Sequence, residues 1–181
     1  MALRQYANPL GAEQLAGRQI DNDRGHPALQ MITASIEAFD DCIDELMPMF
    51  PLHWEELGIF KDKMPLNPDY NVYRQREAMG QLIMPILRKD GKIIGYWPTF
   101  IAPGLHYKST LTATMDILWL HPDHRGDDAG KLLADCVKTE LKRRSVKLWY
   151  AGSKNHKQIE WFFKMLGFDP IESMFAMWIG D

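Results

Sequence analysis

The chain has few cysteines, only a small net charge and no long apolar run. Its two cysteines, Cys42 and Cys136, lie far apart and form no CxxC motif, which excludes a zinc knuckle or a redox motif built from neighbouring thiols. We expect both to be reduced thiols in the protein core. The net charge of −3 and the acidic isoelectric point argue against a nucleic-acid partner.

The sequence also lacks membrane and export signals. No apolar run reaches the roughly 18 residues that span a bilayer, and the opening residues MALRQYANPLG have no apolar core of the kind that a signal peptide needs. We therefore expect a cytoplasmic protein with no membrane partner. The length suits one domain. Residues 1–30 are polar and lack a period, so we expect an arm there, mobile or held by a partner, before a globular domain over 31–181.

The first half of this domain has the pattern of two helices and a hairpin. From Ile36 the apolar residues keep helical spacing until the prolines at 48 and 51 break it. A second helix is predicted over 73–79, where Gly80 can end it. Residues 82–102 are typical of two strands joined at Lys89-Asp90-Gly91, because an Asp-Gly pair tolerates the positive φ angles of a tight turn.

The second half alternates strands and helices. The segment 112–120 is rich in β-branched and large apolar residues and stops before Pro122, which predicts a buried strand. From Ala129 the apolar residues follow the i, i+3, i+4 rule for three to four helical turns. A strand over 147–152, a helix over 159–167 and a final strand over 173–179 complete the pattern.

The strand, turn and helix between Thr114 and Arg144 favour an anion site, because the backbone N–H groups and dipole of a helix amino end attract negative charge. Taken alone, RGDDAG is also typical of a capped connection that binds no ligand. The segment by itself leaves both interpretations open.

The segment LWLHPDHRGDDAGKLL resembles the acetyl-CoA signature of the GNAT superfamily, in which a strand ends before a Pro, an Arg opens the loop and glycines precede the helix. WFFKMLGF is similar to the late helix of that family, and the resemblance covers residues 36–179. It implies an α+β (α/β) fold in which a mixed, mostly antiparallel central sheet is flanked by helices. The segments DKMPLNPDYNVY, GLHYKST and MDILWLHPDHRG also resemble small GNAT-like proteins of tailed phages, which would place the chain in the host cytoplasm.

The resemblance implies an acetyl-CoA-dependent N-acetyltransferase that moves an acetyl group to an amine of a small molecule or protein by direct attack. It assigns carbonyl and pantetheine contacts to the main chain of Leu118, Trp119 and Leu120, and the pantetheine arm also to Asn155 or His156. It assigns pyrophosphate contacts to the loop and first helical residues Arg125, Gly126, Asp127, Asp128, Ala129, Gly130 and Lys131.

Two departures from the family favour an alternative, a catalytically inactive GNAT-fold binding or structural protein of phage origin. Asp128 replaces a usual Gly beside Asp127, and these carboxylates repel a pyrophosphate unless Arg125, His124 and Lys131 outweigh them. Phe163 stands where many members carry a Tyr that protonates the leaving thiolate. The retained Arg125, Gly126 and Gly130 favour the enzyme.

Asp116 is the first candidate for the catalytic base, because an acid among apolar residues has a raised pKa if it is buried. A strand-end Asp bonded to a neighbouring backbone group is the alternative. His106 and Tyr107 are second candidates, with a packed loop as the alternative, and Tyr150 could supply the acid.

Three further features have weaker signals. Trp54, Glu55 and Glu56 could line a pocket for a cationic acceptor or form a plain helix surface. His121 and His124 lack the further ligand spacing of a known metal site, so we expect no metal. The N-terminal arm and the last strand could pair with a second copy in a homodimer.

Overall fold

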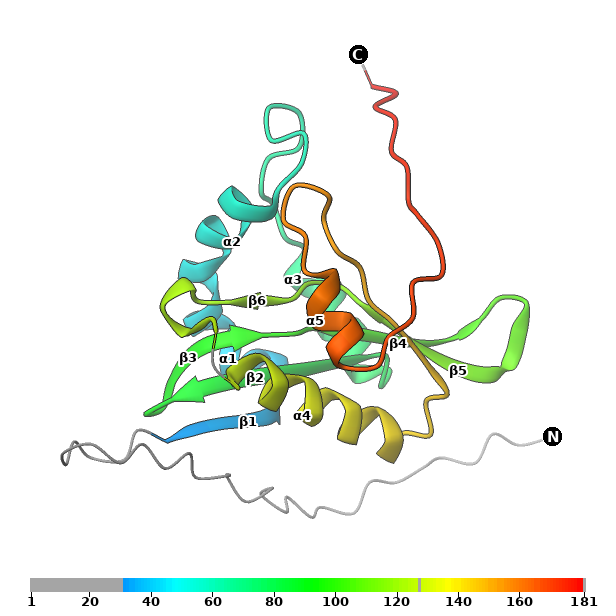
Figure 1. Ribbon diagram of the computed structural model, residues 1–181, viewed down its shortest axis with the longest axis horizontal. Helices are drawn as coiled ribbons and strands as arrows, with labels where there is room; N and C mark the ends of the chain where they lie inside the picture. The colour runs from blue at the N-terminus through cyan, green and yellow to red at the C-terminus, as the bar shows by residue number, and fades with distance from the viewer. Residues whose placement is uncertain (1–30, 127, 181) are drawn as a thin grey trace.

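The computed structural model describes residues 31–126 and 128–180 (Figure 1). The predicted arm over 1–30 and Asp127 lie outside the described residues. In chain order the elements are β1 (Ile32–Glu37), α1 (Phe39–Leu46), the 3₁₀ helix η1 (Met47–Met49), α2 (Phe50–Leu57), α3 (Tyr70–Ala78), β2 (Leu82–Lys89), β3 (Lys92–Tyr96), β4 (Thr99–Gly104), β5 (Tyr107–Met115), β6 (Trp119–Leu120), the 3₁₀ helix η2 (Pro122–His124), α4 (Ala129–Arg143), β7 (Leu148–Tyr150) and α5 (Glu160–Met165).

The strands form one mixed sheet in the order β6-β3-β2-β4-β5-β7, and β1 also pairs with β2. The pairs with β2, β3 and β4 are antiparallel, whereas β5 and β7 run parallel from Thr112↔Leu148 to Thr114↔Tyr150. The prediction of a mixed, mostly antiparallel sheet flanked by helices is confirmed.

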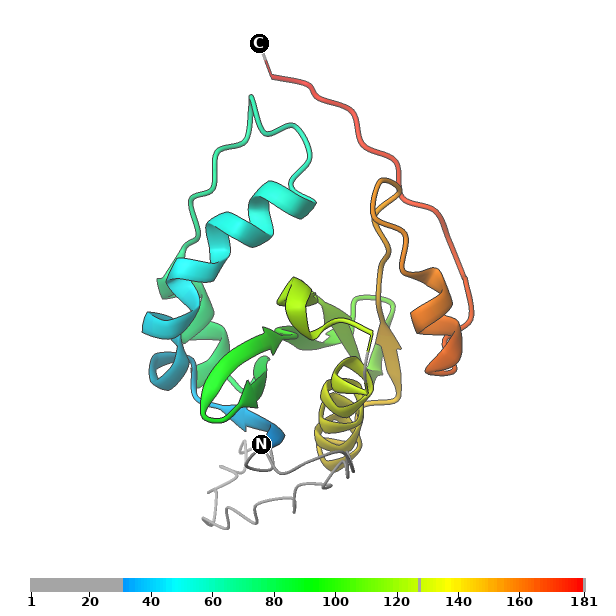
Figure 2. The same cartoon turned by 60° about the vertical axis from the view of Figure 1, so that its left-hand side comes forward.

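Strand β2 is buried on both faces, so its apolar run LIMPIL is continuous rather than alternating. Ile83 and Leu87 face the core beneath α4, whereas Met84 and Ile86 face the core beneath α1. Figure 2 shows the consequence: α1, α2 and α3 cover one face of the sheet, and α4 and α5 cover the other. The helix predicted from Ala129 is confirmed as α4, whose apolar stripe packs on the sheet.

The hairpin prediction is confirmed. Asp90 and Gly91 connect β2 to β3, and both have positive φ angles, 49° and 81°. This is the geometry of the turn that matches the twist of two antiparallel strands. The second predicted strand is interrupted at Trp97–Pro98, because proline has no N–H for the ladder, and it continues as β4.

Three features of the secondary structure differ from the prediction. Residues 32–37 form β1 because their backbone pairs with β2, although no strand was predicted before the first helix. The first helix ends at Leu46, before the prolines, as predicted, but the prolines at 48 and 51 then begin η1 and α2, which were not predicted, because the first turn of a helix needs no N–H donor. Residues 173–179 form no strand: they are exposed and pair with no strand among the described residues.

Both cysteines are buried and free, as predicted, and burial raises the pKa of Cys42 to about 12 and that of Cys136 to about 11. Within 31–126 and 128–180 there is no helix whose length and apolar character would let it cross a bilayer.

Candidate functional site

The strand predicted over 112–120 is broken where the site lies. The last pair of β4 with β5 joins Thr99 to Met115, and the last pair of β3 with β6 joins Tyr96 to Trp119. Between these pairs, the segment from Tyr96 to Thr99 advances three residues, whereas the segment from Met115 to Trp119 advances four. The second segment therefore holds one extra residue, a β-bulge. Asp116, Ile117 and Leu118 therefore belong to neither strand, and the sheet opens beside them.

The pairing on the other side of β5 ends at the same level. Tyr150 is the last residue of β7 that pairs with β5, and the chain then leaves the sheet as the 152–159 loop. A cleft results, lined by α2 and its following loop on one side and by α5 and the 152–159 loop on the other. Figure 2 shows these segments on opposite sides of the open end of the sheet. The volume of the cleft is about 1280 Å³, larger than most sites for one small ligand.

This pocket extends from the bulge to the amino end of α4. Asp116, Leu118, Trp119 and Leu120 line it at the bulge. Arg125, Gly126, Asp128, Gly130 and Lys131 line it at the amino end of α4. The structure thus brings together the two segments that the sequence linked to one coenzyme, with an open path between them.

Among the described residues, no side chain caps the amino end of α4. The first turn of a helix leaves its N–H groups without intrahelical acceptors, and the side chain of the N-cap residue, Asp128, makes no capping hydrogen bond. Gly126 has a φ of 100°, a conformation that L-residues with a side chain rarely adopt. An anion in the pocket can therefore approach this end of the helix.

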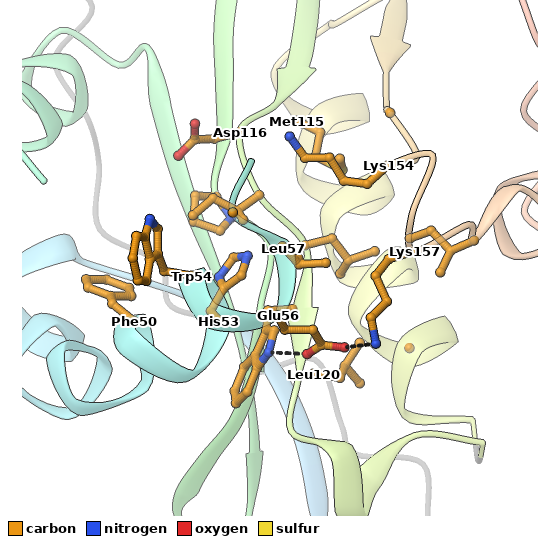
Figure 3. A pocket seen from close by; sticks show the side chains of 18 of the residues that line it. Phe50, His53, Trp54, Glu56, Leu57, Met115, Asp116, Leu120, Lys154 and Lys157 are labelled. Atoms are coloured by element: carbon orange, nitrogen blue, oxygen red, sulfur yellow. Dashed lines mark hydrogen bonds and ion pairs between the residues drawn. The ribbon is translucent and has the colours of Figure 1, made fainter. Parts of the chain in front are cut away.

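Glu56 on α2 is the most heavily bonded charge in the pocket. Its carboxylate accepts two hydrogen bonds from the guanidinium of Arg125, both 2.6 Å, and one from the indole Nε1 of Trp119 at 3.2 Å. The Lys157 ammonium lies 3.5 Å away (Figure 3). Chiefly because of the hydrogen bonds from Arg125, the pKa of Glu56 falls to about 2. This cluster ties α2 to both the α4 loop and the 152–159 loop.

Asp116 faces the same pocket from the bulge (Figure 3). It remains open to the cleft, but the protein around it displaces much of the surrounding water, and this desolvation raises its pKa. The hydroxyl of Tyr73 donates a 2.6 Å hydrogen bond to Asp116 Oδ2, which opposes the rise. Tyr73 is held in place because Asp69 caps the amino end of α3 by accepting hydrogen bonds from the N–H groups of Asn71 and Val72.

His53 lies between α2 and the sheet and is only 6% exposed. Its Nδ1 lies 2.8 Å from the hydroxyl of Tyr96, and its ring stacks on Trp119. Burial lowers its pKa to about 4, so the imidazole is neutral at pH 7. A neutral ring here adds no positive charge to the pocket wall.

The remaining predicted residues have different positions. His156 lines the pocket, but Asn155 and Ala129 do not. His106 and Tyr107 lie at the turn between β4 and β5, away from the lining, and Tyr107 is exposed.

Tyr150 and Phe163 also lie outside the lining. Tyr150 is half-buried on β7, and Phe163 is buried in the core against Trp97 and Phe168. The α5 residues that face the pocket are Trp161, Phe162 and Met165, so a hydroxyl in place of Phe163 would point into the core instead.

Sequence reasoning missed Tyr73, His53, Lys154 and Lys157 as site residues. Of the three α2 residues that could line a pocket or form a plain helix surface, Trp54 and Glu56 line the pocket. Glu55 is exposed and pairs with Lys61. Lys154 and Lys157 could have been identified from the sequence, because they flank His156, a predicted site residue, in the segment that follows the strand after α4.

Comparisons with known proteins agree with this fold. The model of the acetyltransferase (GNAT) family matches residues 39–168. Among solved structures, a ribosomal-protein-alanine N-acetyltransferase from Brucella melitensis biovar Abortus 2308 has a TM-score of 0.66 at 16% identity, over 83% of this chain and 99% of that one. A predicted acetyltransferase with acetyl-CoA from Clostridium acetobutylicum has a TM-score of 0.63 at 15% identity, over 81% and 96%.

An aminoglycoside acetyltransferase from an uncultured soil metagenomic sample, in complex with trehalose, has a TM-score of 0.64 at 12% identity, over 82% of this chain and 95% of that one. No curated protein sequence matches the chain significantly. The identities to these structures establish the fold alone, whereas the family model covers most of the chain. The chain belongs to the acetyltransferase (GNAT) family.

Proposed function

We propose that the chain is an acetyl-CoA-dependent N-acetyltransferase that moves an acetyl group to an amine acceptor. The observation that carries the proposal is one continuous pocket, which joins a carboxylate at the β-bulge to the amino end of α4, where the Asp128 side chain makes no cap. A donor with an anionic tail and a reactive thioester requires these two features at the two ends of one cleft.

The residues at the α4 end fit the charge of acetyl-CoA. Lys131 and Lys157 line this part of the pocket and supply positive charge toward the pyrophosphate and phosphate groups, whereas Lys154 extends beside Met115 (Figure 3). The N–H groups of residues 129–131 would hold the pyrophosphate, and the main chain of 118–120 would hold the thioester end. Arg125 was expected to contact the pyrophosphate, but its guanidinium is paired with Glu56. Its contribution would be to fix the loop before α4.

The charge of Asp128 opposes that binding, but the lysines outnumber it along the described lining of the α4 end. Bound acetyl-CoA would supply an acyl group activated as a thioester. Asp116 would take the proton that the acceptor amine loses, and its raised pKa makes it a better base than an ordinary carboxylate. Tyr73 would orient that carboxylate through its hydrogen bond.

The experiment is a calorimetric titration with acetyl-CoA, combined with a thiol assay for released CoA in the presence of primary amines. Lys131→Glu reverses a charge at the α4 end, and about 1–2 kcal/mol of lost attraction should weaken binding about tenfold. Lys138→Glu is the matched control: it is exposed on the same helix, lies outside the pocket lining, and should leave the affinity unchanged.

Absence of acetyl-CoA binding at millimolar concentration would refute the proposed function. Binding without CoA release from any amine would favour the alternative, a binding protein that has lost catalysis. The cytoplasmic location, the phage origin and the homodimer remain predictions from the sequence.

A further inference from the structure

The two sides of the pocket differ in chemistry. The α2 side, which we call the apolar half, is lined mainly by Phe50, Trp54, Leu57, Met64, Leu66 and Tyr70. The opposite side, the cationic half, carries Lys131, Lys154 and Lys157, together with Arg125, whose charge is paired with Glu56. Figure 3 shows Phe50 and Trp54 on α2 across the pocket from Lys154 and Lys157. If the cationic half takes the phosphates of the donor, the apolar half is left for the acceptor.

The carboxylates of the described lining are Glu56, Asp116 and Asp128. Asp128 lies at the α4 end, and Glu56 is saturated by Arg125, Trp119 and Lys157. Within the described part of the chain, the Asp116 side chain accepts one hydrogen bond, from Tyr73 to its Oδ2, so its other oxygen can accept from an ammonium group. The apolar half therefore offers an acceptor a single negative charge.

No described side chain of the apolar half carries a positive charge; Lys154, whose charge reaches His53, comes from the opposite side. His53, the titratable base on its wall, is neutral and bonded to Tyr96. A carboxylate on the acceptor would therefore lie among apolar side chains without a partner, at a large desolvation cost. A second or third ammonium group would also lack a partner. This argues against acceptors whose body carries a carboxylate or further ammonium groups.

The cleft is bridged above these residues. The 58–69 loop and the C-terminal segment converge there (Figure 2), where Trp178 lies 6.4 Å from the ring of Phe60 and 5.3 Å from the Lys63 ammonium. Such a bridge leaves less room for a folded protein or long peptide than for a compact molecule.

We propose that the acceptor is a small primary amine with one ammonium group on an uncharged aromatic or aliphatic body. This inference rests on the proposed function. The ammonium group binds at Asp116, and the body packs against Trp54, Leu57 and their apolar neighbours. In the transfer Asp116 first takes one proton from the ammonium group, which frees the lone pair of the nitrogen. The nitrogen then bonds to the acetyl carbonyl carbon, the C–S bond breaks with its electron pair on sulfur, and the second proton lost by nitrogen passes to that sulfur, so that CoA leaves as a thiol.

The test measures kcat/KM by release of CoA for five acceptors: 2-phenylethylamine, ethylamine, phenylalanine, spermidine and a short peptide with a free amino end. 2-Phenylethylamine should exceed ethylamine by about 100-fold, because its ring buries apolar area that ethylamine lacks. Phenylalanine shares that ring and adds a carboxylate, so it should be at least as poor as ethylamine. A preference for phenylalanine, spermidine or the peptide would overturn the inference.

Trp54→Ala should reduce the ratio of 2-phenylethylamine to ethylamine about tenfold, by removing apolar contact from the acceptor body. Leu105→Ala is the control, because Leu105 lies exposed at the turn between β4 and β5 and should leave the ratio unchanged. Calorimetry with acetyl-CoA separates the two proposals. If acetyl-CoA binds and another acceptor class is preferred, this inference fails and the proposed function stands; if acetyl-CoA does not bind, both fail.

Discussion

Replacing Asp116 with Asn removes a negative charge and a proton acceptor while it keeps the size of the side chain. The hydroxyl of Tyr73 can still donate to the Asn carbonyl oxygen, so the local packing is retained. A positioned base contributes about 10²–10⁴-fold to a rate, which corresponds to about 3–5 kcal/mol of the barrier. Glu56 cannot take over the proton, because Arg125 holds its pKa at about 2. We therefore expect kcat to fall by about 10²–10⁴-fold.

The same substitution should raise the free energy of unfolding at pH 7. The pKa of Asp116 is raised in the folded protein, so the folded state keeps this proton to higher pH than the unfolded chain does. Stability is therefore lost as the pH rises from the ordinary Asp value, about 3.9, through the folded pKa. Asn carries no such penalty, and the gain is modest because Asp116 is open to the cleft. Below pH 3.9 the difference between the two proteins should disappear.

Two measurements check these expectations: kcat and KM from CoA release, and denaturant unfolding at pH 7 and pH 3.5. The acetyl-CoA affinity from calorimetry should be unchanged, which separates loss of a base from loss of the donor site. Unchanged kcat would refute Asp116 as the base. Lower stability of Asp116→Asn at pH 7 would refute the account of its raised pKa.

Two further substitutions test the architecture of the site. Glu56→Gln should cost about 2 kcal/mol of stability at pH 7, since the fall of the Glu56 pKa to about 2 corresponds to about 3 kcal/mol at most. This stability is present above pH 4.5 and is lost as the pH falls toward 2. The denaturant midpoints of the wild-type chain and of Glu56→Gln should therefore converge in acid. A difference in midpoint that stays constant with pH would contradict this. Gly126→Ala should weaken acetyl-CoA binding about tenfold, because a backbone φ of 100° strains any residue with a side chain. Gly80→Ala is the control: Gly80 has a φ of 69° and lies outside the pocket lining, so this variant should lose similar stability without a change in acetyl-CoA affinity. Equal calorimetric affinities of the two variants would refute a role of the Gly126 loop in binding acetyl-CoA.

The elements that depend on local pattern were predictable from the sequence. The spacing of Leu133, Val137 and Leu141 is sufficient for α4, and Asp90-Gly91 is sufficient for the hairpin. Strand β1 was not predictable, because it depends on the edge that β2 offers rather than on a pattern of its own. The break after Met115 arises because the two neighbouring strand segments differ by one residue in length between their last pairs. The sequence of one strand alone does not show this difference.

The candidate site divides in the same way. The segments at Asp116 and at the α4 end were identifiable, because their residue types suit an acid among apolar neighbours and an anion site. The partners of these residues come from distant parts of the chain: Tyr73 is 43 residues from Asp116, and Glu56 is 69 residues from Arg125. Only the folded sheet brings them together, so their roles could not be assigned from spacing.

The most direct test of the central claim is a crystal structure of the chain with bound CoA. The account predicts the pyrophosphate against the backbone of residues 126–131 and the sulfur end beside the bulge at 116–118, with Asp116 facing it. CoA bound elsewhere, or the amino end of α4 closed by Asp128 while CoA is bound, would contradict it.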